Sequence, residues 1–450
     1  MTGMETPIYD FCTAYAESGT VRLHMPGHKG QPLLGIEALD LTEIRGADSL
    51  YEAEGIIARS EKNAAGLFGS GATLYSTEGS SQCIRAMVMT ALLCRTDRSH
   101  RPVILAARNA HKTFLQACAL LDCDVRWLWP ETPPYSLCRC PVTAKGLERV
   151  LSSMETLPAA VFVTSPDYLG GELPIKELAE TAHRFGIPFL VDNAHGAYLR
   201  FLPEDRHPLT LGADLCCDSA HKTLPALTGA AYLHIGKNAP EEFFENARRA
   251  MAYFGSTSPS YLILQSLDLV NRYLAEAYPE KLLHCIRRLS AWKLAVTENG
   301  WQLGESDPLK MTVDAAASGW HGHDLARRLR QGGVECEYAD PDFVVLMATP
   351  ETSDSDLAAA KAALGDNPRK GHPRSTAPTL LPPESVCSPR EAAFAPGEWV
   401  EVRHAAGRIL ADANVSCPPA VPVAVSGERI GADTIPVLEY YGITKLWVVK

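Results

Sequence analysis

The sequence Ser219-Ala-His-Lys-Thr-Leu-Pro225 lies between two mostly apolar runs, residues 213–217 and 229–235. Short apolar runs bounded by polar residues are typical of buried strands. The pattern predicts two strands joined by a short loop, with the stem of Lys222 sheltered and its amine directed into a cleft. Because desolvation disfavours an ammonium ion, a lysine placed in this way can attack an aldehyde as a neutral amine. A single lysine at a strand end is more often simply exposed, so the remaining sequence decides between the two interpretations.

The segment before this loop alternates predicted strands with predicted helices. Apolar runs at residues 103–107, 159–164 and 187–191 are separated by helical patterns such as residues 175–185. This alternation indicates a mostly parallel sheet covered by helices on both faces, and it predicts an α/β fold.

A polar segment follows each of these runs, and the three segments contain His111, Ser165 and Asp192. Ligands of open α/β sheets bind in the crevice outside the carboxyl ends of the strands. We therefore expect these side chains to face one crevice together with Lys222.

The stretch Thr77-Glu-Gly-Ser-Ser81 opens a predicted helix whose apolar residues recur at helical spacing. A helix that starts with Gly79, Ser80 and Ser81 offers backbone N–H groups, two hydroxyls and the positive end of the helix dipole. Together these groups can hold a phosphate. A serine at this place, taken singly, is more often only a helix N-cap.

A nucleophilic lysine and a phosphate seat together indicate pyridoxal phosphate, which is held as a Schiff base to a lysine. Asp192 lies thirty residues before Lys222, one strand earlier, and its carboxylate can keep the ring nitrogen of this cofactor protonated. His195 is a candidate contact for the phenolic oxygen of the ring, with a structural role in its turn as the alternative. His111 is a candidate to stack on the ring face.

Composition excludes several other classes of function. The formal net charge of −11 at pH 7 argues against nucleic acid and anionic membrane surfaces as partners. The 13 cysteines are scattered without the spacing of a zinc site, so we expect reduced thiols and no bound metal. The sequence has neither an apolar run that spans a bilayer nor the features of a secretory signal, and we expect a cytoplasmic protein.

The pattern along the chain predicts three parts. Residues 1–60 form an N-terminal arm, and residues 61–300 form a large cofactor-binding domain with connecting helices. Residues 301–450 form a smaller α+β domain, with an exposed and mobile loop at residues 366–383 that is rich in proline and charge. Residues 399–410 in this part are expected to be helical.

A set of motifs resembles the Orn/Lys/Arg decarboxylase family of fold type I pyridoxal phosphate enzymes, which have an aspartate aminotransferase-like large domain. The motifs span nearly the whole chain in the family's order, and as a set they are highly specific. The matching stretches are His24-Met-Pro-Gly-His-Lys-Gly30, Asp40-Leu-Thr-Glu43, Asn109-Ala-His-Lys112, Thr164-Ser-Pro166, Val191-Asp-Asn-Ala-His-Gly-Ala197, Ser219-Ala-His-Lys222, Ser256-Thr-Ser-Pro-Ser-Tyr261 and Ser388-Pro-Arg-Glu-Ala392.

The resemblance implies that Lys222 carries the cofactor, that Asp192 pairs with its ring nitrogen and that His111 stacks on its ring. It also implies that the phosphate is held by a group of hydroxyl and imidazole side chains, namely Ser80, Ser81, Ser219 and His221. Ser256 and Thr257 resemble the segment that reaches the phosphate of the neighbouring subunit. This implies an obligate homodimer with a shared active site, and assembly beyond the dimer stays open.

The reaction implied by the resemblance is the release of CO2 from the α-carbon of lysine, arginine or ornithine. The chain resembles the short form of the family, which lacks an N-terminal receiver-like domain and whose members favour lysine or arginine over ornithine. A buried distal cation needs an anionic or carbonyl partner, and Glu428 and His28 are the candidate substrate contacts.

The chain departs from the family's pattern at two positions. Asn193 stands where family members commonly have an acidic residue, and Cys417 stands where they commonly have an aromatic residue. The second position lies near the place where the distal group of the substrate is expected, so it bears on substrate identity more than on reaction type.

Two other kinds of function stay open at this point. An aminotransferase or another Cα-lyase uses the same fold, because the reaction depends on which Cα bond stands perpendicular to the cofactor ring, and the sequence does not fix that bond. A catalytically silent homologue that acts as a cofactor-binding or regulatory subunit is a different class. The intact Lys222, Asp192 and His111 argue against it.

Overall fold

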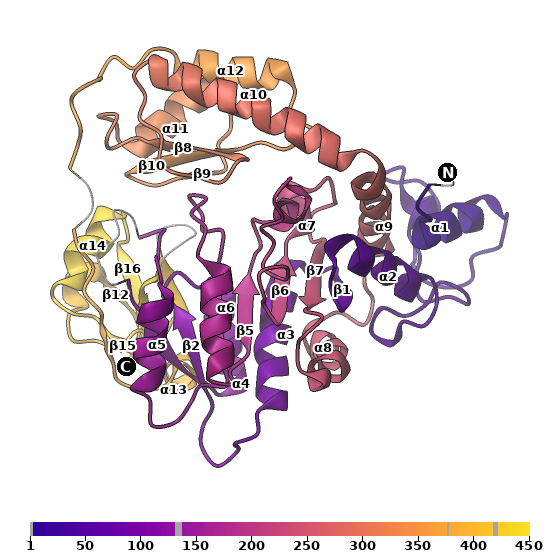
Figure 1. Cartoon of the computed structure of the whole chain (residues 1–450), viewed down its shortest axis with the longest axis horizontal. Coiled ribbons are helices and arrows are strands. Elements are labelled where there is room, and N and C mark those ends of the chain that lie inside the picture. The colour runs from indigo at the N-terminus through magenta and orange to yellow at the C-terminus, as the bar shows by residue number, and fades with distance from the viewer. Residues whose placement is uncertain (1–2, 131–136, 376–377, 417–421) are drawn as a thin grey trace. The chain divides into compact units, whose positions relative to one another are not determined.

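The structure is a computed structural model that describes residues 3–130, 137–375, 378–416 and 422–450 (Figure 1). The chain folds into two compact units, each made of two separated stretches of sequence. The first unit comprises Met1–Thr96 and Pro188–Lys281, and the second comprises Asp97–Ile187 and Leu282–Lys450. This division differs from the expected parts 1–60, 61–300 and 301–450, which stay a prediction.

Seven strands form the main sheet, and they divide between the units. The strands are β1 (Ala72–Ser76), β2 (Val103–Ala107), β3 (Asp124–Leu128), β4 (Ala160–Thr164), β5 (Phe189–Asp192), β6 (Leu215–Asp218) and β7 (Ala231–Ile235). The order is β1-β7-β6-β5 in the first unit and β4-β2-β3 in the second. β2 is parallel to β3 and β4, and β5 is parallel to β6, whereas β7 is antiparallel to β1 and β6. The predicted α/β fold with a mostly parallel sheet is confirmed.

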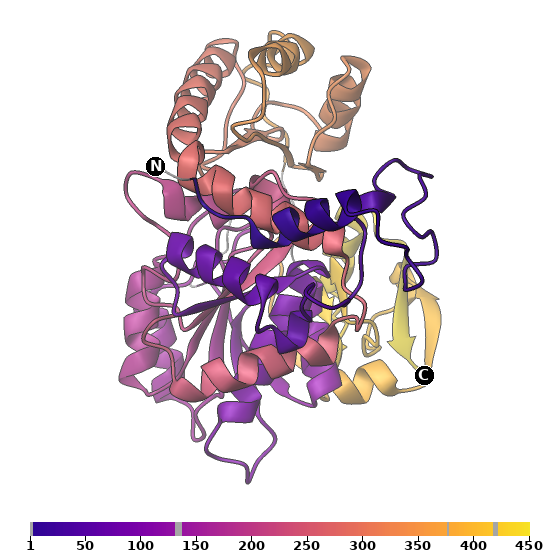
Figure 2. The ribbon, with the colours of Figure 1, turned by 90° about the vertical axis from the view of Figure 1, so that its right-hand side faces the viewer.

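Helices cover the strands of the first unit, as complete burial of β5, β6 and β7 requires. Its helices are α1 (Pro7–Glu17), α2 (Ile56–Phe68), α3 (Gly79–Cys94), α7 (Ala220–Thr223), α8 (Glu241–Phe254) and α9 (Tyr261–Glu276), with short 3-10 segments at Glu37–Leu39, Leu50–Glu52 and Ala197–Phe201. α3 packs along α8, and α1, α2 and α9 pack together (Figure 2). The expected loop around Lys222 is a single helical turn, α7, directly after β6.

The second unit contains the remaining strands of the main sheet and a small α+β part. Its helices are α4 (Lys112–Leu121), α5 (Ala144–Ser152), α6 (Ile175–Arg184), α11 (Gly322–Gln331), α12 (Asp354–Leu364), α13 (Pro389–Phe394) and α14 (Thr434–Tyr440), and α10 (Tyr278–Glu298) begins in the first unit. β8 (Lys310–Asp314), β10 (Phe343–Met347) and β9 (Tyr338–Ala339) form an antiparallel sheet in this order.

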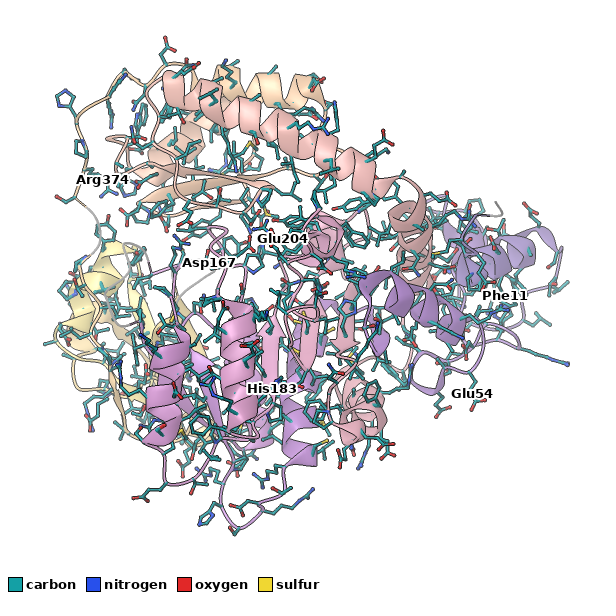
Figure 3. All side chains as sticks on the ribbon, viewed as in Figure 1. Phe11, Glu54, Asp167, His183, Glu204 and Arg374 are labelled. Atoms are coloured by element: carbon teal, nitrogen blue, oxygen red, sulfur yellow. The ribbon has the colours of Figure 1, made fainter. Side chains whose placement is uncertain are left out.

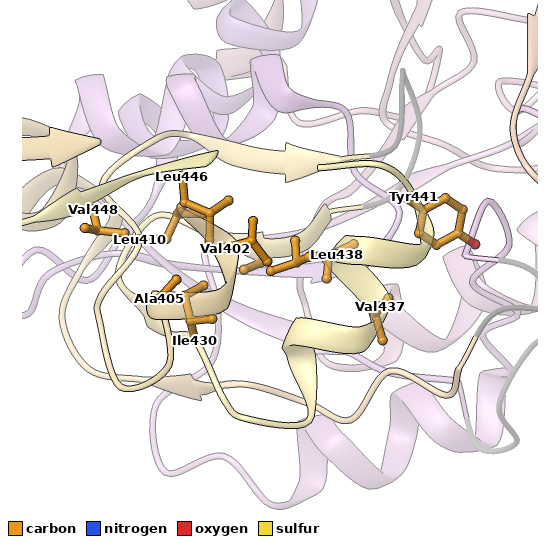
Figure 4. Close-up of a cluster of buried hydrophobic side chains, with 11 residues drawn as sticks. Val402, Ala405, Leu410, Ile430, Val437, Leu438, Tyr441, Leu446 and Val448 are labelled. Atoms are coloured by element: carbon orange, nitrogen blue, oxygen red, sulfur yellow. The ribbon is translucent and has the colours of Figure 1, made fainter. Parts of the chain in front are cut away.

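The C-terminal segment has a hydrophobic core of its own, to which Val402, Leu410, Leu438 and Leu446 contribute (Figure 4). It is framed by three strand pairs: β11 (Glu384–Ser385) with β15 (Glu428–Arg429), β12 (Gly397–Glu401) with β16 (Lys445–Val449), and β13 (Asn414–Ser416) with β14 (Pro422–Val425). The prediction of a helix at residues 399–410 is wrong. That stretch begins within β12, continues into a 3-10 turn at Val402–His404 and reaches Gly407 at a φ of 82°, a conformation that ends a helix.

In the described ranges, no helix is both long and apolar enough to cross a membrane. The described residues of the expected mobile loop at 366–383 form no helix or strand. Cys417 lies outside the described residues.

Candidate active site

Lys222 and His195 lie together in the first unit. Lys222 projects from α7, which begins two residues after the end of β6, and His195 lies in the turn after β5. The Nζ atom of Lys222 is 3.1 Å from the Nε2 atom of His195. Both strands are buried and parallel, so their carboxyl ends bring the two side chains to one edge of the sheet.

Asp192 is the last residue of β5, and its side chain is 3% exposed. One carboxylate oxygen accepts a hydrogen bond from Ala194 N at 3.1 Å and a weaker one from Cys217 Sγ at 3.5 Å. In the described part of the chain, the other oxygen accepts no hydrogen bond. This oxygen is therefore available to accept a hydrogen bond from a partner that is not part of the chain.

The start of α3 meets the end of β6. Ser219 donates a hydrogen bond from its hydroxyl to that of Ser80 at 2.8 Å. Gly79 begins the helix at a φ of 71°, which favours glycine, and a Cβ atom there would have open space around it. The N-terminus of this 16-residue helix therefore presents backbone N–H groups beside two hydroxyls, which is the arrangement expected for a phosphate seat.

His221 and Ser81 are the sequence neighbours of Lys222 and Ser80 in the first unit. The Nδ1 atom of His221 is 3.0 Å from the carbonyl oxygen of Ala230, which orients the ring. Ser81 follows Ser80 in the first turn of α3 and is half-buried.

His111 and Ser165 belong to the second unit. His111 is the N-cap of α4, and its Nδ1 atom accepts a hydrogen bond from Thr113 N at 3.3 Å. Ser165 is buried and accepts one from Leu173 N at 3.0 Å. Close by in sequence lies Asp167, which is labelled in Figure 3. It accepts hydrogen bonds from two backbone N–H groups, and burial raises the pKa of its carboxyl.

Glu428 has a different partner from the one expected. Its two oxygens accept hydrogen bonds from Arg108 at 2.6 and 2.8 Å, and both side chains are 2% exposed. The Arg108 guanidinium lies 4.8 Å from the ring centres of both Trp127 and Trp129. Because Arg108 occupies both oxygens, the structure speaks against a role for Glu428 in reading the distal group of a substrate.

The other predicted residues of the first unit lie in its loops. The Nε2 atom of His28 is 3.2 Å from Asp40 Oδ2, and its Nδ1 atom accepts a hydrogen bond from Gly30 N at 2.9 Å. Ser256 and Thr257 are exposed between α8 and α9.

A buried polar cluster in the first unit was not predicted from the sequence. Asp218 Oδ2 lies 2.9 Å from His207 Nε2 and 3.3 Å from His234 Nε2, and all three side chains are 0% exposed. Burial alone would raise the pKa of the Asp218 carboxyl, but His207 and His234 outweigh burial and lower it. The available signal was a charged residue at the end of an apolar run, directly before Ser219.

His207, Cys216 and Asp218 also have the donor atoms of a metal site. Asp218, however, already pairs with His207 and accepts a hydrogen bond from Cys216 at 3.7 Å. We therefore interpret the cluster as a hydrogen-bond network.

Comparison with solved structures defines the class of the fold. The chain is similar to the lysine decarboxylase LdcF of Francisella novicida, with a TM-score of 0.81 and 16% identity over 99% of this chain and 81% of that one. The constitutive lysine decarboxylase of E. coli gives a TM-score of 0.79 and 17% identity over 99% and 82% of the two chains. At these identities the likeness shows the fold alone, which is that of the fold type I pyridoxal phosphate enzymes.

Comparison of sequences defines the family. The family model described as "Orn/Lys/Arg decarboxylase, major domain" matches residues 6–326, and the corresponding "C-terminal domain" model matches residues 379–448. An arginine decarboxylase of Bacillus subtilis (strain 168) is 29% identical over 467 residues, covering 97% of this chain and 93% of the relative. One of Bacillus anthracis is 27% identical over 463 residues, covering 96% and 92%. The chain belongs to the Orn/Lys/Arg decarboxylase family of pyridoxal phosphate-dependent enzymes, and the resemblance found in the sequence is confirmed.

Proposed function

We propose that this amino-acid decarboxylase binds pyridoxal phosphate at Lys222 and releases CO2 from a basic amino acid. The observation that carries the proposal is the grouping of Lys222, His195 and the buried Asp192 at the ends of two neighbouring parallel strands. The chain also supplies what the cofactor needs: an amine for its aldehyde, a carboxylate oxygen of Asp192 that accepts no hydrogen bond within the described chain, and a helix N-terminus with Ser80 and Ser219 for its phosphate.

Each residue has a defined task in this proposal. Lys222 joins the aldehyde carbon, and Asp192 holds a proton at the ring nitrogen, where burial strengthens the charge pairing. Gly79, Ser80, Ser81, Ser219 and His221 hold the phosphate, while His195 orients the Lys222 amine from 3.1 Å. His111 and Ser165 remain proposed contacts of the ring. When bound, the cofactor acts as a sink for the electrons left on the α-carbon after CO2 departs.

We place arginine first among the substrates, ahead of lysine and ornithine. Relatives at 27–29% identity that cover nearly the whole chain are named arginine decarboxylase, which supports this order. Glu428 is not assigned to the substrate because Arg108 occupies both its oxygens. His28, with Asp40 3.2 Å away, is kept as a proposed substrate contact.

A homodimer with a shared active site is part of the same proposal. Exposed apolar side chains gather in the N-terminal arm between α1 and α2: Val21, Leu23, Met25, Leu33, Leu34 and Ile36. Such a group on a soluble domain marks an interaction surface, and a second copy of the chain is the proposed partner. Ser256 and Thr257 are exposed, as residues would be that reach the phosphate site of the partner.

The test is to load the purified protein with pyridoxal phosphate and incubate it separately with arginine, lysine and ornithine. We expect CO2 and agmatine from arginine as the fastest reaction. Transfer of the amino group to a keto acid without release of CO2 would support an aminotransferase instead. A protein that develops no visible absorbance with the cofactor would be the catalytically silent homologue. The cytoplasmic location expected from the sequence remains part of this proposal.

A further inference from the structure

Asp192 and Asp218 lie at the ends of neighbouring strands, but their side chains lie on opposite faces of the sheet. Asp192 is paired with Cys217 in the parallel register of β5 and β6, and Cys217 donates a hydrogen bond to it. Side chains alternate along a strand, so Asn193 and Asp218, one residue further on, face the opposite side. There Asn193 Nδ2 donates a hydrogen bond to Asp218 Oδ1 at 2.7 Å.

The Asp218 carboxylate is held rigidly from the side opposite to Asn193. Its Oδ2 atom is shared by His207 at 2.9 Å and His234 at 3.3 Å. The Nδ1 atom of His234 is in turn 2.8 Å from the Thr73 hydroxyl on β1. Every member of this network is buried, so its hydrogen bonds are strong and its geometry is fixed.

Asn193 connects this network to the turn that carries the active-site histidine. Gly196 N donates to the carbonyl oxygen of Asn193 at 2.7 Å, which closes the turn that contains His195. A Cβ atom on Gly196 would lie 2.0 Å from the side-chain oxygen of Asn193, so the amide packs directly against this turn. A shift of the Asn193 side-chain amide would therefore move His195, and it would also move Asp192, the residue directly before Asn193.

The amide at position 193 also fits the charge of its partner. The family resemblance leads one to expect an acidic residue here, and its carboxylate oxygen would stand where Asn193 Nδ2 stands, 2.7 Å from Asp218 Oδ1. Two ionised carboxylates at this distance repel each other strongly in a buried site.

We infer that Asn193 and Asp218 are a pair of positioning residues that aim Asp192 and His195 at the cofactor from the opposite face of the sheet. The inference rests on the proposed pyridoxal phosphate site. It assigns to the Asp218 cluster a task in catalysis that goes beyond the stability of the core.

The test compares Asn193→Asp, Asp218→Asn and the double variant that exchanges the two side chains. Asp214→Asn is the matched control, because Asp214 is also a buried aspartate next to β6 and accepts a hydrogen bond from Phe189 N at 2.7 Å. We expect each single variant to weaken cofactor affinity by about tenfold, the scale of coupling within one hydrogen-bond network. We also expect a changed visible absorbance of the bound cofactor and a fall in kcat that exceeds any change in KM. The double variant should lose less cofactor affinity than the product of the two fold-losses of the single variants.

Thr73→Val serves as a milder variant if a substitution at position 218 prevents folding, since it removes only the hydroxyl beside His234. It should shift affinity and absorbance in the same direction by a smaller amount. The inference is wrong if the variants and Asp214→Asn lower the melting temperature alike but leave cofactor affinity and absorbance at wild-type values. A wild-type protein that binds no pyridoxal phosphate would instead defeat the proposed function, and the inference with it.

Discussion

The hydroxyl of Ser219 donates a hydrogen bond to the hydroxyl of Ser80 at 2.8 Å, although 139 positions separate the two residues in the chain. This contact joins the N-terminus of α3 to the strand end that precedes Lys222. It places two hydroxyl donors beside backbone N–H groups that have no partner within the helix. A phosphate bound there would tie together the two segments that the proposal assigns to the cofactor.

Ser80→Ala and Ser219→Ala should each weaken pyridoxal phosphate affinity while leaving the fold intact. A hydrogen bond to a charged group contributes about 1.5–3 kcal/mol, so we expect a loss of roughly tenfold or more for each hydroxyl. Equilibrium titration of the apoprotein with the cofactor measures this change. Ser290→Ala, which removes a hydroxyl bonded within α10, is the control and should bind the cofactor normally. Unchanged affinity in both test variants would remove these serines from the phosphate seat.

Lys222→Ala should abolish turnover and the visible absorbance of the bound cofactor, because no amine remains to join the aldehyde. The cofactor can still bind through its phosphate. Reduction with borohydride, followed by peptide mapping, locates the modified lysine. Lys112→Ala, at an exposed lysine of α4, is the control and should keep the adduct. An adduct that survives in Lys222→Ala would mean that another lysine carries the cofactor.

Asp192→Asn should preserve the fold and lower kcat by several orders of magnitude. An uncharged amide does not hold a proton at the ring nitrogen, so the electron sink becomes weak. Steady-state kinetics with saturating cofactor and circular dichroism together separate a chemical defect from a folding defect. A rate close to that of the wild type would exclude this task for Asp192.

Arg108→Met and Glu428→Gln should destabilise the protein, since each breaks a buried ion pair and leaves one partner without its counterpart. The expected loss in the free energy of unfolding is about 3–5 kcal/mol for Arg108→Met, which leaves the Glu428 charge buried alone. Denaturant unfolding measures it, and the double variant Arg108→Met/Glu428→Gln should lose less free energy of unfolding than the sum of the two single losses. A large rise in KM for Glu428→Gln at unchanged stability would instead restore Glu428 as a substrate contact.

Leu23→Asp should weaken the proposed dimer and, through it, cofactor binding. Leu23 is 91% exposed in the N-terminal arm, so a charge there costs the monomer little but disrupts an apolar interface. Sedimentation velocity with and without cofactor measures association. Leu294→Asp, at a 63% exposed leucine of α10, is the control. A wild-type protein that is monomeric at full cofactor occupancy would contradict the shared site.

The parts of the fold that depend on local pattern were predictable from the sequence. The helical pattern at residues 175–185 corresponds to helix α6, found at Ile175–Arg184, because apolar side chains at helical spacing need only a surface to pack against. The buried strands β5 and β6 were recognisable from their short apolar runs. Strand β3 escaped notice because only its last residue, Leu128, is buried, so its pattern lacks the apolar run of a central strand.

The errors arose where a distant partner decides the outcome. Residues 399–401 are a strand because Trp399 pairs with Trp447 on β16, a contact that local propensity does not contain. The partner of Glu428 is Arg108, 320 positions earlier in the chain. The motifs pointed to Lys222, Asp192 and Ser80 because such chemistry recurs in a recognisable order, and the tasks of these residues stay predictions. The Asp218 network depends on strand register and was visible only in the structure.

The division of the first unit into two stretches of sequence has a consequence for how the protein is made. Strand β1 pairs with β7, and the Thr73–His234 contact between them spans 161 positions. At roughly 5–20 residues per second, a ribosome needs on the order of ten to thirty seconds to deliver that partner. During this interval the nascent β1 cannot form its ladder with β7, so this edge of the sheet is completed only after residue 235 has emerged.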